Sequence, residues 1–241
     1  MYVFRTLPLL ARETLWQARI YLRDRAAVFF TFAFPILVLF FWSWQGTNVL
    51  TAAAFVAALA LAMAGYAGLA MGIAAAREEG LLKRIRSTPL PMFAHITARA
   101  LAAGVLGALA VGLTLGVGVT ALGLPLAVGK AMGLLPGLLA GFIALGGWGL
   151  VVGSLAKTAA AASYLANLTL FPLFLLSAAA QRGMLPDWAA AITPWLPLQS
   201  LSILIQQTLA GEGWSLLPLL TLLVWGGLGL VLAAWRLSRP L

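Results

Sequence analysis

Long uncharged apolar stretches alternate along this chain with short segments that carry nearly all of its charge. Residues 26–76 contain no Asp, Glu, Lys or Arg, and later stretches repeat the pattern. Because a helix crosses a hydrocarbon layer of about 30 Å in about 20 residues, the pattern predicts membrane-spanning helices. Six are expected, at about 26–44, 49–76, 100–122, 132–156, 158–180 and 215–235.

The stretch 181–214 is apolar enough to suggest a seventh span, but it contains several prolines, glutamines and an aspartate. With six spans, thirteen of the fifteen Lys and Arg residues lie on one side of the membrane. A seventh span would move Arg236 and Arg239 to the other side, against the positive-inside tendency. We therefore predict an outer-face segment of short helices, either re-entrant or interfacial, with Trp188, Trp195 and Trp214 at the interface.

The first 25 residues combine apolar and basic positions with a helical period. This pattern predicts an amphipathic helix on the cytoplasmic surface, as a domain 1–25 in front of a transmembrane domain 26–241. The interfacial residues are expected to be Arg12, Trp16, Arg19, Arg23 and Arg25. The alternative is a basic leader that only fixes topology.

Composition supports the membrane assignment, since 63% of the residues are apolar and only 9% are charged. The net charge of +9 is explained by orientation in a bilayer, with both termini cytoplasmic in a multi-pass inner-membrane protein, and nucleic acid is not an expected partner. The absence of cysteine excludes disulfides and thiolate metal sites.

Groups that could perform catalysis or bind a metal are scarce. The single histidine, His95, has no carboxylate or serine at a suggestive spacing, and a structural or solvated role is expected. No predicted span contains Asp or Glu, and "GLPLAVGKA" at 123–131 misses the P-loop spacing and has Ala131 in place of Ser or Thr. We expect neither an enzyme nor a metal site nor a bound cofactor, so any ATP would act elsewhere.

Glycines recur every fourth residue through the fourth predicted span. Small residues at this spacing let helices approach closely in lipid. Packing within the subunit is the favoured interpretation, and a contact with a second subunit is the alternative. The glycines are Gly129, Gly133, Gly137 and Gly141.

The largest predicted inner loop, residues 77–92, has a helical pattern of its own. Leu81, Leu82 and Ile85 fall on one side, and Glu79 can pair with Lys83 one turn later. Prolines at the end of the loop stop the helix before the third span. The pattern favours a short amphipathic docking helix over a basic loop that only sets topology.

The loop "REEGLLKRIRSTPL" at 77–90 resembles the signature between the second and third spans of the type-2 ABC transporter permease family, the membrane subunits of exporters. "RDRAAVFFTFAFPI" at 23–36 and "PDWAAAITPWLPL" at 186–198 are similar to further segments of that family, in the same order along the chain. Leu81 departs from the family pattern, since many members carry Thr there.

The resemblance implies a half-transporter, in which two six-span subunits pair and each receives a separate cytoplasmic ATPase at the loop helix and the amphipathic leader. ATP and Mg would then bind to the ATPase, and the subunits would form a homodimer or a heterodimer with a close paralogue. Drugs, lipids, lipid-linked glycans and peptides all stay open as cargo. The residues expected to couple to the ATPase are Arg77, Glu78, Glu79, Gly80, Leu81, Leu82, Lys83, Arg84, Ile85, Arg86, Thr88 and Pro89.

The expected fold class is therefore an all-α integral membrane protein with six transmembrane helices. An N-terminal amphipathic interfacial helix, a short cytoplasmic coupling helix and the outer-face helical segment complete it. Two other functions stay open: a membrane scaffold or assembly factor that transports nothing, and the membrane component of an ATP-driven vitamin importer. A neighbouring gene for an ATPase without spans would favour the exporter.

Overall fold

The computed structural model describes residues 3–81, 92–126 and 128–238, and these residues form helices and short connections without any strand. The all-α fold class is confirmed. Six helices are long and apolar enough to cross a membrane: Arg25–Trp44, Val49–Glu78, Phe93–Leu122, Met132–Leu155, Ala159–Gln181 and Leu216–Ser238.

The first two of these spans are each built from consecutive segments that include one π-helical stretch, η1 or η2. In chain order the elements are α1 (Val3–Arg23), α2 (Arg25–Val28), η1 (Phe29–Ala33), α3 (Phe34–Trp44), α4 (Val49–Ala62), η2 (Met63–Gly68), α5 (Leu69–Glu78), α7 (Met92–Leu122), α8 (Val128–Leu155), α9 (Ala159–Gln181), α10 (Asp187–Ile192), the 3₁₀ turn η3 (Thr193–Trp195), α11 (Pro197–Ala210) and α12 (Leu216–Ser238).

Polar side chains and glycines mark the helix ends. Asp24 accepts hydrogen bonds of 2.9 and 3.1 Å from the first backbone N–H groups of α2, and Asn48 and Thr158 cap α4 and α9 in the same way. Gly211, with φ at +83°, ends α11 in the left-handed conformation that glycine adopts without strain. α7 begins at Met92, earlier than the predicted 100, because no helix breaker follows the last proline of the loop.

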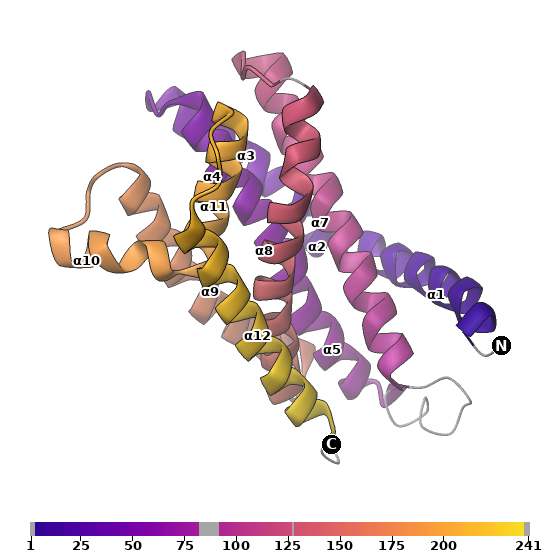
Figure 1. Cartoon of the computed structure of the whole chain (residues 1–241). Coiled ribbons are helices and arrows are strands. Elements are labelled where there is room, and N and C mark those ends of the chain that lie inside the picture. Colours follow the sequence, from indigo (N-terminus) through magenta and orange to yellow (C-terminus); the bar gives the residue numbers. More distant parts are fainter. Residues whose placement is uncertain (1–2, 82–91, 127, 239–241) are drawn as a thin grey trace.

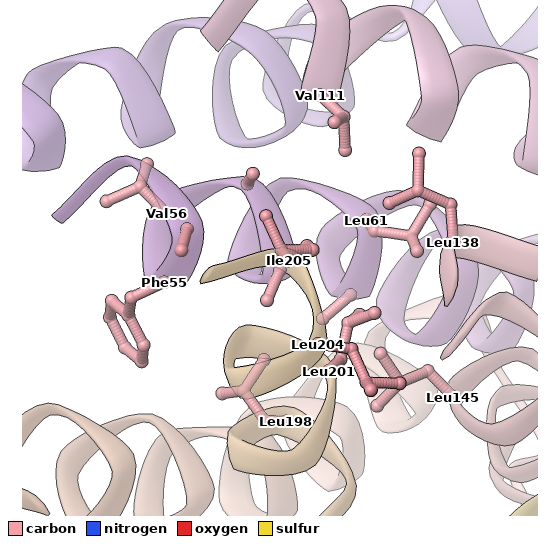
Figure 2. Packing of buried hydrophobic residues seen from close by; sticks show 14 of the residues in the cluster. Phe55, Val56, Leu61, Val111, Leu138, Leu145, Leu198, Leu201, Leu204 and Ile205 are labelled. Atoms are coloured by element: carbon pink, nitrogen blue, oxygen red, sulfur yellow. The ribbon is translucent and has the colours of Figure 1, made fainter. Parts of the chain in front are cut away.

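The bundle is arranged around α4, which other helices enclose almost completely (Figure 1). Leucines of α11 and residues of α7 and α8 converge on it, and Figure 2 shows Leu201, Leu204 and Ile205 facing this core. The ring of Phe55 in α4 stacks on Trp42 of α3 with 4.6 Å between ring centroids. Close packing of this kind holds helices together in lipid, where apolar burial alone gives little drive for association.

The stretch 181–214 packs into the bundle through α11. α10 with η3 and α11 meet at 79°, and α11 lies against α4, α8 and α12, with Leu198, Leu201 and Leu209 fully buried. Within this bent pair α11 is thus part of the packed bundle, whereas α10 is largely exposed. The three tryptophans predicted for the interface, Trp188, Trp195 and Trp214, are all exposed.

The glycines singled out in α8 pack within the chain. Gly129 lies in the first turn of α8, and a Cβ atom on Gly133 or Gly137 would contact α11. A Cβ atom on Gly141 would lie 2.5 Å from Leu201 Cδ1, closer than a real contact allows. The four-residue glycine spacing of α8 thus serves the packing of α11 against α8.

The end of α5 and the end of α12 lie at the same end of the bundle, which we call the α5 end (Figure 1). α1 lies outside the bundle and packs along α7. Residues 17–21 of α1, residues 77–81 and residues 154–159 come together around the α5 end, although they are far apart along the chain.

Candidate functional site

Arg77, in the last turn of α5, joins the second span to the end of α8. Its Nη1 donates to the carbonyl oxygen of Ser154 at 3.0 Å and to that of Ala156 at 3.4 Å. The last carbonyls of a helix have no partner within the helix and form the negative end of its dipole. A guanidinium at this position therefore satisfies and stabilises the carboxyl end of α8.

Glu78, the next residue, binds the beginning of α9. Its Oε2 accepts a hydrogen bond of 2.9 Å from the backbone N–H of Ala159, the first residue of that helix. The amino end of a helix carries unpaired N–H groups and positive potential, so it suits a carboxylate. Arg77 and Glu78 thus hold both ends of the short α8–α9 connection, and we call them the Arg77–Glu78 clamp.

Gly80 directs the chain away from this clamp. Its φ of +68° ends the helix in a conformation that side chains rarely adopt, and its N–H donates to the carbonyl of Arg77 at 3.0 Å. Leu81 is half-buried and Glu79 is exposed. The other residues predicted to couple to an ATPase lie outside the described residues: Leu82, Lys83, Arg84, Ile85, Arg86, Thr88 and Pro89.

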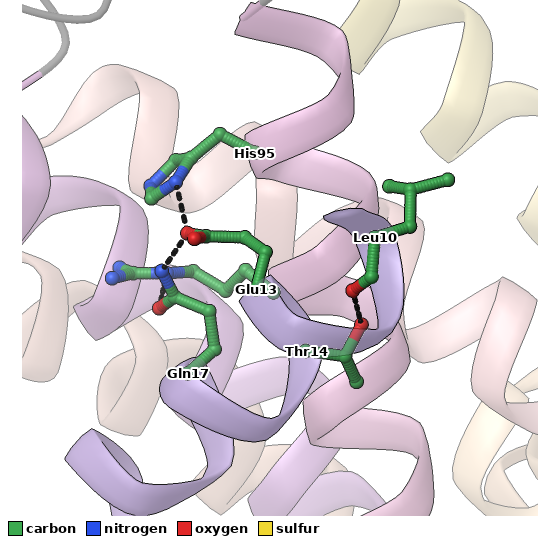
Figure 3. Close-up of polar contacts among 6 residues, drawn as sticks. Leu10, Glu13, Thr14, Gln17 and His95 are labelled. Carbon is green, nitrogen blue, oxygen red and sulfur yellow. Dashed lines mark hydrogen bonds and ion pairs between the residues drawn. The ribbon is translucent and has the colours of Figure 1, made fainter. Parts of the chain in front are cut away.

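A second group of polar side chains joins α1 to α7 (Figure 3). Glu13 Oε1 lies 2.9 Å from His95 Nδ1 and accepts a 2.8 Å hydrogen bond from Gln17 Nε2. Gln17 Oε1 in turn accepts a 3.0 Å bond from Arg99 Nε. We call these four residues the α1–α7 latch.

The latch is buried at its centre. His95 is 2% exposed and Gln17 is 5% exposed, whereas the Glu13 side chain is 25% exposed. Because an ionised carboxylate can only accept, His95 Nδ1 carries the hydrogen in this pair. Glu13 and Glu79 both lie near enough to Arg99 to stabilise its positive charge. Carboxylates of α1 and of the end of α5 thus both attract the same arginine of α7.

A cleft of about 210 Å³ with a mainly apolar wall lies beside the latch. Its lining includes Gln17 and Arg99 of the latch, Glu79 and Leu81 at the beginning of the loop, and Ala159, the residue to which Glu78 binds. Gly72 contributes a close approach, since a Cβ atom there would lie 2.7 Å from Arg99 Nη1. The beginning of the loop, the beginning of α9 and α1 therefore share the walls of one cleft.

The five residues predicted to be interfacial are all exposed, four of them on α1 and Arg25 at the beginning of α2. Tyr21 points the other way and shares a 2.6 Å hydrogen bond with the hydroxyl of Thr31. Burial raises the pKa of the Tyr21 phenol. α1 is thus an amphipathic helix with a polar and aromatic face toward the bundle. The exposed residues are Arg12, Trp16, Arg19, Arg23 and Arg25.

Local spacing does not predict the latch, because Glu13 and His95 are 82 residues apart. One signal was present: Glu13 and Gln17, like His95 and Arg99, are four residues apart and therefore share a helix face. His95 has the structural role expected of it, but with a carboxylate partner that its neighbours in sequence do not reveal.

Comparisons with known proteins identify the family of the chain. A family model described as ABC-2 family transporter protein matches residues 43–236, which is most of the chain and includes the clamp and both residues of the latch on α7. The comparisons with curated proteins and with solved structures found no match. This multi-pass membrane protein belongs to the ABC-2 family of transporter proteins.

Proposed function

We propose that this chain is the permease subunit of an ABC exporter and that a separate cytoplasmic ATPase docks at the α5 end. The observation that carries the proposal is the Arg77–Glu78 clamp, which ties the beginning of the loop to the α8–α9 connection. A force on the loop would therefore reach three spans directly. In this proposal ATP and Mg bind to the ATPase, and the permease supplies the path for the cargo.

The latch supports a second route for the same motion. Glu79 and Leu81 line the cleft that also contains Gln17 and Arg99, so a displacement of the loop would change the environment of the latch. α1 would then move with the loop as the ATPase closes. The segment Arg77 to Pro89 contacts the ATPase in this mechanism, with the leucines as apolar anchors and the charges as orienting pairs.

The positive-inside tendency supports an orientation with the α5 end in the cytoplasm. Thirteen of the fifteen Lys and Arg residues belong to segments at or next to this end under the six-span arrangement. Both termini are then cytoplasmic, in the inner membrane. The stretch 181–214, with its bent helix pair, faces the outside.

A dimer is proposed because one six-span chain supplies only one side of a two-sided path, and the first and fifth spans have exposed surface at which a second copy would pack. The most apolar stretches of the first and fifth spans are only 22% and 17% buried, against 78% for the second span. Two copies, or this chain and a close paralogue, would cover part of that surface and enclose a path. A measured mass of one chain, both alone and with the ATPase bound, would rule this out.

The experiment that tests coupling neutralises two carboxylates at the α5 end. In the double variant Glu78→Gln, Glu79→Gln, binding of the ATPase and stimulation of its hydrolysis should both fall several-fold, because charged partners strengthen hydrogen bonds. The matched control is Asp187→Asn, Glu212→Gln, which removes two exposed acids elsewhere. Equal behaviour of the two double variants, with normal insertion, would show that the loop is only a basic anchor.

A further inference from the structure

The first, second and fifth spans line a half-open cavity of about 330 Å³ within one chain. Segments α2, η1, η2 and α9 form most of its wall. Small-molecule sites in proteins have volumes of about 300–1,000 Å³, so the cavity has room for a compact ligand. It is separate from the clamp, and it meets the cleft beside the latch at the residues that line both, Tyr21, Ala27, Gly68 and Met71.

Two π-helical segments line this one cavity. η1 contributes Phe30 and Thr31, and η2 contributes Met63, Ala67 and Gly68. A π-helical turn is rare and occurs frequently at functional sites, because it widens the helix and redirects nearby groups. Two such turns from different spans line the same cavity, which points to a cavity whose shape serves a function.

Asn167 supplies an unused polar group inside the fifth span. Its side chain is exposed, lines the cavity and makes one long hydrogen bond, of 3.4 Å, to Ser163 Oγ. An amide can make four hydrogen bonds, so most of its capacity is free among the described residues. A polar side chain within a membrane span is costly unless it is paired or used, which makes Asn167 a candidate for ligand recognition.

The wall of the cavity is uncharged and mainly apolar. The described residues that line it include no Asp, Glu, Lys or Arg. Four phenylalanines contribute to the wall: Phe30, Phe34, Phe171 and Phe174. An ionised ligand would lose its hydration here without gaining a counter-charge, so the wall selects for neutral molecules.

We propose that this cavity binds a neutral amphipathic molecule, with an alkyl or aryl body against the phenylalanines and a small hydroxyl, amide or ester group on Asn167 and Ser163. That such a molecule is exported rests on the proposed function, whereas binding itself does not. Neither the family match nor the clamp indicates this substrate class.

The test uses a photoactivatable medium-chain monoacylglycerol and the purified full chain in nanodiscs. Labelling should be saturable, should be displaced by unlabelled monoacylglycerol, and should map to α9 and η2 by mass spectrometry. Asn167→Trp, which fills the cavity, should reduce labelling about tenfold or more. The matched control is Leu168→Trp on the neighbouring 71% exposed position, which should label like the parent.

Two further measurements keep the result decisive. Asn167→Leu keeps the branched shape of the side chain and removes its hydrogen bonds, so affinity should fall about fivefold. A photoactivatable lysophosphatidate, which carries a negative charge on a similar chain, should label the cavity at least about tenfold less. Two results would overturn the proposal and indicate annular lipid only. One is labelling that does not saturate and is spread equally over lipid-facing positions such as Val105; the other is labelling that is unchanged in Asn167→Trp.

The outcome is distinguishable from failure of the proposed function because no ATPase takes part in the labelling. Saturable labelling in a chain that binds no ATPase would overturn the exporter and keep the binding site. Normal ATPase stimulation without saturable labelling would overturn the binding site and keep the exporter.

Discussion

Glu13→Ala should release α1 from α7, because Glu13 is the acceptor that Gln17 and His95 share. Both donors are almost completely buried, and a buried donor without a partner costs about 1–3 kcal/mol. The Glu13 side chain is 25% exposed, so water replaces part of what is lost. We therefore expect a net loss of about 2 kcal/mol, which corresponds to about thirtyfold in the equilibrium between docked and released α1.

Amide hydrogen exchange measures this equilibrium directly, since local opening sets the rate at which protected amides exchange. Amides of residues 10–22 should exchange about thirtyfold faster in Glu13→Ala, whereas those of α4 should be unchanged. Glu13→Gln keeps an acceptor oxygen and should lose less. Arg12→Ala, at the exposed neighbouring position, serves as the control. If Glu13→Ala exchanges like the parent, the latch contributes nothing to the docking of α1 and the reasoning is refuted.

Three other predictions concern packing, the clamp and orientation. Gly149→Ala should lower the melting temperature, because its Cβ atom would lie 2.5 Å from a backbone carbonyl oxygen of η2. The control Gly112→Ala, whose Cβ atom would have nothing within 4 Å, should leave the melting temperature unchanged or raise it slightly. Arg77→Ala should reduce ATPase stimulation several-fold without loss of insertion, since the last carbonyls of α8 lose their donor; full stimulation would leave the clamp without a role in coupling. In intact cells an impermeant thiol reagent should label Gly213→Cys but not Ser238→Cys, and the opposite pattern would invert the topology.

The spans could be predicted from the sequence because the thickness of the hydrocarbon layer sets the length of each apolar run. The place of α11 could not be predicted in the same way. Its glutamines suggest a surface, yet Gln199 is buried, and Gln206 and Gln207 lie at the edge of the core. There Gln206 donates to Thr51 and Gln207 pairs with Ser215, while the leucines of α11 are buried. Periodicity shows which face is apolar but not which neighbour will satisfy the polar positions.

The candidate site, too, could be predicted only in part from the sequence. The Arg-Glu pair of the loop stands out in the sequence, but the pattern suggested contacts with a partner, whereas the structure gives both side chains bonding partners on the α8–α9 connection. These partners lie 77 to 81 residues away, and helix ends far along the chain are not visible to local spacing. Contacts with an ATPase stay a prediction for the rest of the loop.

The π-helical turn η2 has a consequence for the rotational phase of the second span. One residue advances an α-helix by about 100°, and a π-helical turn accommodates one residue more than an α-helical turn does. α5 is therefore rotated about its axis relative to a straight continuation of α4. This turn in the middle of the span therefore sets the direction in which the Arg77 and Glu78 side chains point from α5. Deleting a single residue within Met63–Gly68 would turn both side chains away from α8 and α9, although every residue that they contact would be unchanged.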